Sequence, residues 1–255
     1  MRSLLLLILL LPAFPAYGSD ERLVEVKTRP GVSVPVYLMK RTDAVATVVL
    51  LPGGNGGIGI SGGVPTSRDF LVKNREQFLD SGFNVAVVGR PRDKKNLDLS
   101  ARKGPEHLTD LHKIVEYLRR DAPLPVWLVG ISRGTVSAAA AAIAFGNEDL
   151  AGIVLASSVT DPTVPYAVPR LRLGRIRIPV LVLHHEKDEC DLCDPDGVDQ
   201  IMAGLINTAV AKAVLVNNGR WPGGDPCTSS HWHGYSGMEE EAVDIISEWI
   251  KHPVS

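Results

Sequence analysis

The chain has 255 residues, of which 45% are hydrophobic and 22% are charged, and its formal net charge at pH 7 is -2. This composition is typical of a globular protein with one sizeable hydrophobic core. The small net charge gives no electrostatic reason to expect nucleic acid or an anionic membrane as a partner.

The first 18 residues have the pattern of a secretory signal peptide. Met1 and Arg2 form a short basic segment, and the leucine-rich run that follows is too short to span a bilayer. Small residues then give a cleavage site after Gly18. We therefore expect a signal peptide over 1–18, a single domain over 19–255 without a membrane span, and a secreted or periplasmic protein. An uncleaved N-terminal anchor is the alternative.

Strand patterns open the mature chain. An antiparallel pair is expected over 23–28 and 32–39, because Arg29-Pro30-Gly31 between them is a turn signal. The next strand, 46–51, is continuously apolar and rich in β-branched residues, as strands buried on both faces are. It leads into the glycine-rich segment 52–57, which cannot be regular structure.

Helical patterns alternate with the later strands. A helix is expected over 68–81, capped by Thr66 or Ser67, and a final helix over 238–251, where Ser236 and Glu239 have capping-box spacing. The other expected elements are helices that include 108–118, 135–145 and 197–206, and strands at 83–88, 126–130, 150–156, 178–183 and 212–216.

This alternation predicts a mostly parallel sheet that is covered by helices on both faces. The connection over 157–177 is short and leaves little room for a lid domain.

A chemical motif stands at the end of the strand over 126–130. Gly130-Ile131-Ser132-Arg133-Gly134 matches the pattern G-x-S-x-G, with an apolar strand before it and a helix-forming run after it. A nucleophile elbow needs this order of strand, turn and helix, because the serine must project from a sharp turn at the end of the strand. The context therefore favours Ser132 as a nucleophile over a structural serine.

The chain resembles the α/β-hydrolase superfamily along essentially the whole mature sequence. The resemblance rests on the elbow around Ser132, the glycine-rich segment after Leu51, and an acid and a histidine in the expected order. It implies an α/β fold with a central sheet of about eight strands and little or no lid. The most similar branch is that of the small dienelactone-hydrolase-like enzymes, although members named for dienelactone cleavage carry a cysteine nucleophile where this chain has serine.

The resemblance also implies where the other two members of a catalytic triad lie. The acid follows the strand over 178–183, where Asp188 matches the family position and Asp191 is the alternative. The histidine lies on the loop before the last helix, where His233 fits best and His231 is the alternative. A carboxylate at the first place would hold the imidazole in the tautomer that accepts the serine's proton.

An oxyanion hole completes the site that the resemblance implies. The glycine-rich segment would supply the backbone amide of Gly54 or Asn55, and the residue after the nucleophile, Arg133, would supply the second amide. A phosphate-binding loop is the alternative, but the lysine and the serine or threonine of a P-loop are missing.

Three cysteines remain, Cys190, Cys193 and Cys227. In an exported chain we expect one disulfide and one free thiol. Cys190 with Cys227 is the favoured pair, because the resemblance places both beside the active site, and Cys193 with Cys227 is the alternative. Cys190 and Cys193 have C-x-x-C spacing, but a structural zinc site usually needs four ligands and no second such pair exists. We expect no metal.

Together, these expectations predict a serine hydrolase that cleaves a carboxylic ester of a small molecule and needs no cofactor. Amide or thioester cleavage would use the same residues. A non-catalytic binding protein of the same fold is the alternative of a different class, because a fold does not fix a function. The residues leave the acyl group and the oligomeric state open.

Overall fold

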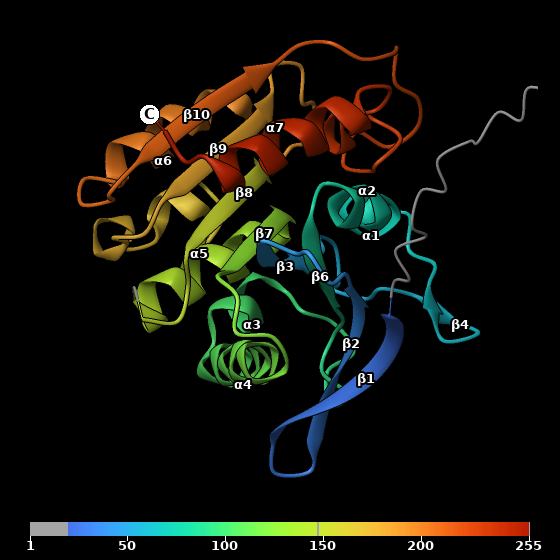
Figure 1. Ribbon diagram of the computed structural model, residues 1–255. Coiled ribbons are helices and arrows are strands. Elements are labelled where there is room, and N and C mark those ends of the chain that lie inside the picture. The colour runs from blue at the N-terminus through green and yellow to red at the C-terminus, as the bar shows by residue number, and fades with distance from the viewer. Residues whose placement is uncertain (1–19, 147, 255) are drawn as a thin grey trace, which may run out of the picture.

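The computed structural model describes residues 20–146 and 148–254, so the predicted signal peptide lies outside the described residues. An eight-stranded sheet runs through the molecule in the order β1-β2-β6-β3-β7-β8-β9-β10 (Figure 1). The bounds of these strands are β1 (Asp20–Arg29), β2 (Val32–Lys40), β3 (Ala46–Leu51), β6 (Phe83–Val88), β7 (Val126–Ser132), β8 (Gly152–Ser158), β9 (Val180–His185) and β10 (Ala211–Val216).

The sheet is mostly parallel. Strand β2 is antiparallel to both of its neighbours, β1 and β6. From β6 to β10, all neighbouring strands in the sheet are parallel. The carboxyl ends of β3, β7, β8 and β9 therefore meet at one edge, which is where open α/β sheets bind their ligands.

Helices cover both faces of the sheet (Figure 1). One face packs against α1 (Phe70–Lys73), α2 (Arg75–Asp80) and α7 (Glu239–Lys251). The other packs against α3 (Leu99–Lys103), α4 (Pro105–Asp121), α5 (Arg133–Phe145) and α6 (Val198–Gly204). Strand β3 shows why two layers form, because Val49 and Leu51 enter one apolar core whereas Val48 and Leu50 enter the other.

The sequence predicted the eight strands of the sheet and the alternation with helices, and both are confirmed. The expected helix over 68–81 is wrong as one element. The structure instead has two short helices here. Helix α1 starts at Phe70 and is capped by the side chain of Asp69, and Asn74 separates it from α2. Asp69 takes the capping role because its carboxylate accepts the amide hydrogen of Leu71 at 2.9 Å.

Three further details depart from the prediction. The expected capping box of Ser236 with Glu239 does not form, because Met238 is the N-cap of α7 and no side chain caps it. Helix α3 was not expected. Neither was the two-stranded sheet of β4 (Ile60–Ser61) and β5 (Val64–Pro65), whose strands are too short to show a period.

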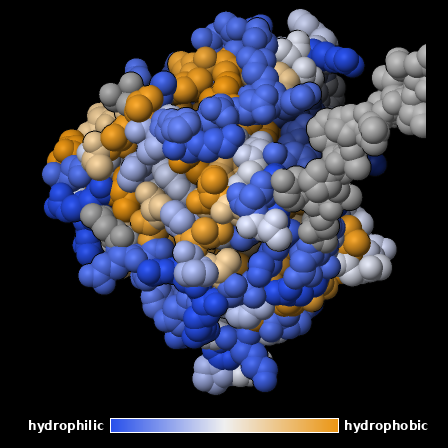
Figure 2. Space-filling view, viewed as in Figure 1, coloured by the Kyte–Doolittle hydropathy of each residue, from blue (hydrophilic) through white to orange (hydrophobic). Residues whose placement is uncertain are grey.

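The segment between β8 and β9 is a short connection that holds the single 3₁₀ turns η1 (Val168–Arg170) and η2 (Leu173–Arg175). The described residues hold no lid domain over the sheet edge, as the sequence predicted. None of the helices in the described ranges has both the length and the hydropathy of a membrane span. Figure 2 shows apolar residues in small groups that polar residues separate on the visible face.

Candidate active site

Ser132 is the last residue of β7 and the N-cap of α5, so the chain turns sharply at this residue. Its backbone has φ 52° and ψ -127°, a conformation that costs free energy for any residue except glycine. A side chain at Gly134 would place its Cβ 2.0 Å from the carbonyl oxygen of Leu51, and one at Gly130 would lie 2.5 Å from that of Gly134. The flanking glycines therefore allow the close packing that the turn requires, as the motif predicted.

Asp188 and His233 meet although 45 residues separate them. His233 lies in the 3₁₀ turn η4 (Trp232–Gly234), and its Nδ1 is 2.8 Å from Oδ2 of Asp188. Because an ionised carboxylate only accepts, Nδ1 is the donor, and Nε2 of the neutral ring is left as an acceptor. Both side chains are buried. This is the tautomer that a general base for a serine hydroxyl needs.

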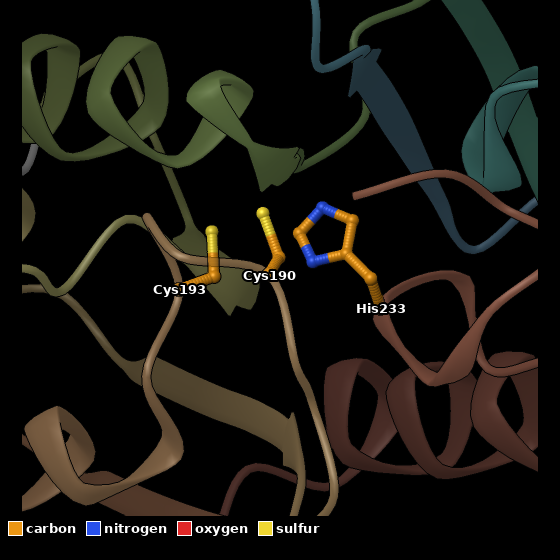
Figure 3. A group of neighbouring side chains, drawn as sticks. All are labelled: Cys190, Cys193 and His233. Atoms are coloured by element: carbon orange, nitrogen blue, oxygen red, sulfur yellow. The ribbon is translucent and has the colours of Figure 1, made fainter. Parts of the chain in front are cut away.

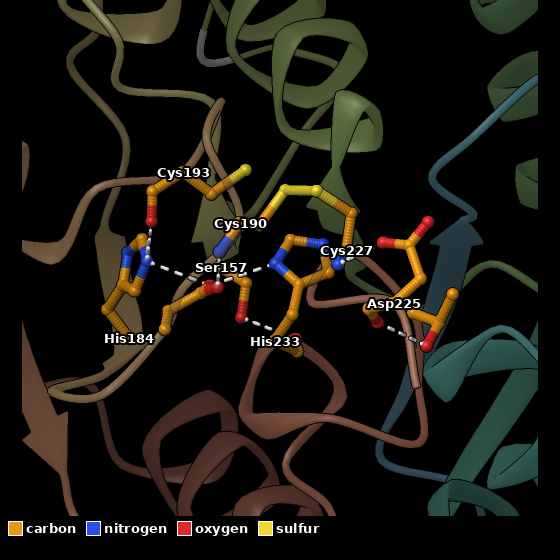
Figure 4. Close-up of a disulfide and its surroundings, with 9 residues drawn as sticks. Ser157, His184, Cys190, Cys193, Asp225, Cys227 and His233 are labelled. Atoms are coloured by element: carbon orange, nitrogen blue, oxygen red, sulfur yellow. Dashed lines mark hydrogen bonds and ion pairs between the residues drawn. A yellow bond between two sulfur atoms is a disulfide. The ribbon is translucent and has the colours of Figure 1, made fainter. Parts of the chain in front are cut away.

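Further donors fix the Asp188 carboxylate. The amide of Cys190 donates to Oδ1 at 3.0 Å, and Nε2 of His184 lies 3.3 Å from Oδ2 (Figure 4). Burial would by itself raise the pKa of Asp188, but the hydrogen bonds from His184 and His233 outweigh it and lower that pKa to about 2. The carboxylate is therefore ionised and oriented at neutral pH.

The loop that carries His233 is anchored beside the end of β7. Ser157 on β8 donates from its hydroxyl to the carbonyl oxygen of His233 at 2.8 Å, and the next residue, Ser158, is the register partner of Ser132. Within the described residues, Ser132 and His233 share no hydrogen bond. In structures without a substrate such bonds are often long, and they tighten when the substrate binds.

The free thiol of Cys193 lies close to the candidate site. Its thiol sulfur is within 4.8 Å of a ring nitrogen of His233 (Figure 3). Burial raises the pKa of Cys193 well above its ordinary value, the charge of Asp188 adds to this, and a contact with the side chain of Ser132 acts in the opposite direction. One buried thiol thus neighbours both Ser132 and His233.

The alternatives that the sequence left open occupy other places. Asp191 is exposed. Nε2 of His231 lies 3.4 Å from a carboxylate oxygen of Glu189, and its ring packs edge-on against Trp232 at 5.3 Å between centroids. The acid–histidine hydrogen bond of this site is thus made by Asp188 and His233.

A buried arginine supports the glycine-rich segment after β3. Arg102 on α3 is only 2% exposed. Its Nη2 donates to the carbonyl oxygens of Pro52, Gly53 and Gly54 at 3.0, 3.1 and 3.3 Å. Its Nη1 donates to the hydroxyl of Ser137 on α5 at 3.0 Å. Burial lowers the pKa of Arg102 to about 10, so the guanidinium still carries its charge at neutral pH.

These contacts orient the amides of the segment. The N–H of a trans peptide points opposite to the C=O of the preceding residue, and the described residues contain no cis peptide. When the carbonyls of Gly53 and Gly54 point at Arg102, the amides of Gly54 and Asn55 point away from it. Neither amide has a hydrogen-bond acceptor in the described part of the chain, whereas the amide of Gly53 donates to Asp69 at 2.9 Å.

The segment also lies directly against Ser132. A Cβ at Gly53 would stand 2.9 Å from Cβ of Ser132. The predicted donors Gly54 and Asn55 therefore adjoin Ser132, and Arg133, whose amide is the third predicted donor, follows it in the chain. Together they form a candidate oxyanion hole.

Sequence reasoning missed Arg102, Asp69, His184 and Ser157. Arg102 lies between the expected strand over 83–88 and the expected helix that includes 108–118, where no element was predicted, and its partners in the glycine-rich segment are 48 to 50 residues away. No local pattern marks such contacts. A signal did exist for His184, because it precedes Asp188 at the end of an apolar strand.

The expected disulfide between Cys190 and Cys227 is confirmed, and Cys193 is free and buried. Figure 4 shows the bond joining the Asp188 loop to the loop that leads to His233. Cys190, Cys193 and His233 offer donor atoms within 4.8 Å of one another. Since the sulfur of Cys190 is bonded to Cys227, it is not a thiolate that could bind a metal.

No protein-family model matches the chain, and no curated protein does. Solved structures do match. A dienelactone hydrolase from Anabaena variabilis is 16% identical, with a TM-score of 0.67 over 92% of this chain and 98% of that one. An esterase from Pyrococcus furiosus is 13% identical, with a TM-score of 0.67 over 95% of each chain.

A third match is described as a serine hydrolase without a lid, from Xanthomonas campestris. It is 16% identical, with a TM-score of 0.55 over 94% of this chain and 95% of that one. At these identities the likeness concerns the fold. The chain therefore has the α/β-hydrolase fold in its dienelactone-hydrolase-like form.

Proposed function

We propose that the protein is a serine hydrolase that cleaves carboxylic esters of small molecules through an acyl-enzyme intermediate. The observation that carries the proposal is the 2.8 Å hydrogen bond between His233 and Asp188, anchored next to the strained turn that presents Ser132. A buried acid, a histidine and a serine of this kind are the parts of nucleophilic acyl transfer.

In the proposed reaction, Nε2 of His233 takes the proton of the Ser132 hydroxyl while Oγ attacks the ester carbonyl carbon. Negative charge develops on the carbonyl oxygen and is stabilised by the amides of Gly54 or Asn55 and of Arg133. When the intermediate collapses, the C–O bond to the alcohol breaks and the alkoxide takes the proton from His233. A water molecule then attacks the acyl-enzyme by the same route and releases the acid.

Export through a cleaved signal peptide is part of the proposal. The Cys190–Cys227 bond supports it, because disulfides persist in oxidising compartments such as the periplasm and the extracellular space.

The test is hydrolysis of p-nitrophenyl acetate and p-nitrophenyl butyrate by the disulfide-bonded protein, beside Ser132→Ala. We expect turnover by the wild type and a loss of more than about 10⁴-fold in the variant, since the triad acts as one unit. A fluorophosphonate probe should label the wild type at Ser132 and leave the variant unlabelled.

The same assay separates the alternatives. An anilide and a thioester with the same acyl group would show whether amide or thioester cleavage is preferred. Absence of turnover for all three, together with an unlabelled Ser132 in folded protein, would contradict the proposal and favour a non-catalytic binding protein.

A further inference from the structure

A cavity of about 590 Å³ lies away from the candidate active site, along the outer side of α5. Its walls come from the second half of α5, the adjoining ends of α3 and α4, and the segment over 165–175 that links β8 to β9. Ser132, Asp188 and His233 do not line it. A molecule bound there would therefore not touch the proposed catalytic residues.

The lining is strongly cationic. Four of its residues carry a positive charge and none carries a negative one, although the whole chain has a formal net charge of -2. The four are Lys103, Arg170, Arg172 and Arg175. Such a concentration of one sign of charge in a concave site attracts anions.

These charges are not neutralised inside the protein. No ion pair joins any of the four to a carboxylate of the described residues. Arg170 donates from Nη1 to the carbonyl oxygen of Pro162 at 2.6 Å, and Nζ of Lys103 lies 4.2 Å above the ring of Tyr166. Both partners are uncharged. The guanidinium groups of Arg172 and Arg175 are exposed, so they are available to an anion from outside.

The rest of the cavity wall is apolar. Leu108 of α4, Ile143 of α5 and Leu171 of the connecting segment contribute aliphatic side chains, and Ala140 and Ala144 leave room between them. Half-buried hydrocarbon and a charged rim together suit a ligand with a hydrocarbon body and an anionic head.

We propose that this cavity binds a small amphipathic carboxylate, with its carboxylate at Arg172 and Arg175 and its hydrocarbon chain against Ile143 and Leu171. The volume falls within the roughly 300–1,000 Å³ of small-molecule sites. A hollow of this size fits a free carboxylate with an alkyl chain better than it fits the surface of a membrane. The proposal does not rest on the hydrolase activity.

The experiment is calorimetric titration of the disulfide-bonded protein with decanoate below its critical micelle concentration. Decyltrimethylammonium serves as the matched ligand with the same chain and the opposite charge. We expect saturable binding of decanoate that weakens as salt is added, and no saturable binding of the cation. The double variant Arg172→Gln/Arg175→Gln should weaken decanoate binding at least tenfold.

Two further variants make the test specific. Ala144→Phe, at an exposed helix position, should block the hydrocarbon part of the cavity and abolish binding without unfolding the protein. Arg177→Gln removes a neighbouring exposed arginine that does not line the cavity, and it should leave the affinity unchanged. Hydrolysis of p-nitrophenyl acetate should be the same in all of these variants as in the wild type.

Three results would overturn the proposal. The first is no saturable binding of decanoate by folded wild type. The second is equal binding by wild type, Arg172→Gln/Arg175→Gln and Ala144→Phe, which would place decanoate elsewhere, including at Ser132. The third is binding to phosphatidylglycerol vesicles but not to free decanoate, which would make the cationic surface a membrane contact.

Discussion

Ser132 stands where a buried strand passes directly into a helix, whereas Asp188 and His233 stand on irregular loops that follow β9 and β10. On the first side, the backbone turn and the packing of Gly130 and Gly134 set the position of the hydroxyl. On the second side, two loops from different parts of the chain are joined by the Cys190–Cys227 bond and by hydrogen bonds to Asp188. A local motif can place a nucleophile, but the acid and the histidine need cross-links between distant segments.

The largest expected effect comes from breaking the acid–histidine pair chemically while keeping its shape. Asp188→Asn should lower kcat for p-nitrophenyl butyrate by about 10⁴-fold, because the amide favours the wrong tautomer of His233. Labelling of Ser132 by a fluorophosphonate should slow in parallel. Asp191→Asn, three residues away and exposed, is the control and should keep wild-type rates. Equal losses in the two variants would remove Asp188 from its proposed role.

Removing the Cys190–Cys227 bond tests the support of the loops that carry Asp188 and His233, without touching the turn at Ser132. Cys190→Ser/Cys227→Ser should lower the free energy of unfolding by about 3–4 kcal/mol, because the bond closes a loop with a sequence separation of 37. Urea unfolding measures this loss. If the double variant were as stable as wild type, the loops would be held by their non-covalent contacts.

Arg102 supports the glycine-rich segment that lies beside Ser132. Arg102→Lys should lower kcat by about 10- to 100-fold with little change in KM. A single ammonium group cannot make both the Nη2 contacts to the three carbonyls that orient the Gly54 and Asn55 amides and the Nη1 contact to Ser137. Arg119→Lys, a surface arginine paired with Asp149, is the matched control. A fall in melting temperature without a fall in kcat at 25 °C would assign Arg102 a role in stability alone.

The smallest effect is a pH dependence of stability. The folded-state pKa of Asp188 is about 2, below the value of 3.8 for the free group. The stabilisation from its ionised form is therefore complete only above about pH 5, and it is lost as the pH falls toward 2. Over this range wild type should lose on the order of 1–2 kcal/mol more in urea unfolding than Asp188→Asn, because other carboxylates with lowered pKa values, such as Glu25 and Asp93, contribute equally to both proteins. Parallel curves for the two proteins would contradict the assignment.

The sequence could predict the parts of the molecule whose signal is local. Periodicity located the eight strands, and the G-x-S-x-G pattern located the turn at Ser132. The disulfide partner was also chosen correctly, because the family order places the loops of Cys190 and Cys227 together.

What the sequence could not predict depends on tertiary contacts. The break at Asn74 follows from a side chain that donates to the carbonyl of Phe70 at 2.8 Å, which competes with helix geometry in a way that no periodicity reveals. The burial of Arg102 follows from carbonyls about 50 residues earlier in the chain. Polar residues in loops are usually solvated, so composition favours the wrong environment for such a side chain.

The Cys190–Cys227 bond has a consequence for where the proposed enzyme can work. In a reducing cytoplasm the two thiols would stay separate, and the loops that carry Asp188 and His233 would lack their covalent link. Their arrangement would then depend on the hydrogen bonds to Asp188 and His233 alone. Under the proposed export, oxidation would add this link only after the protein has left the cytoplasm.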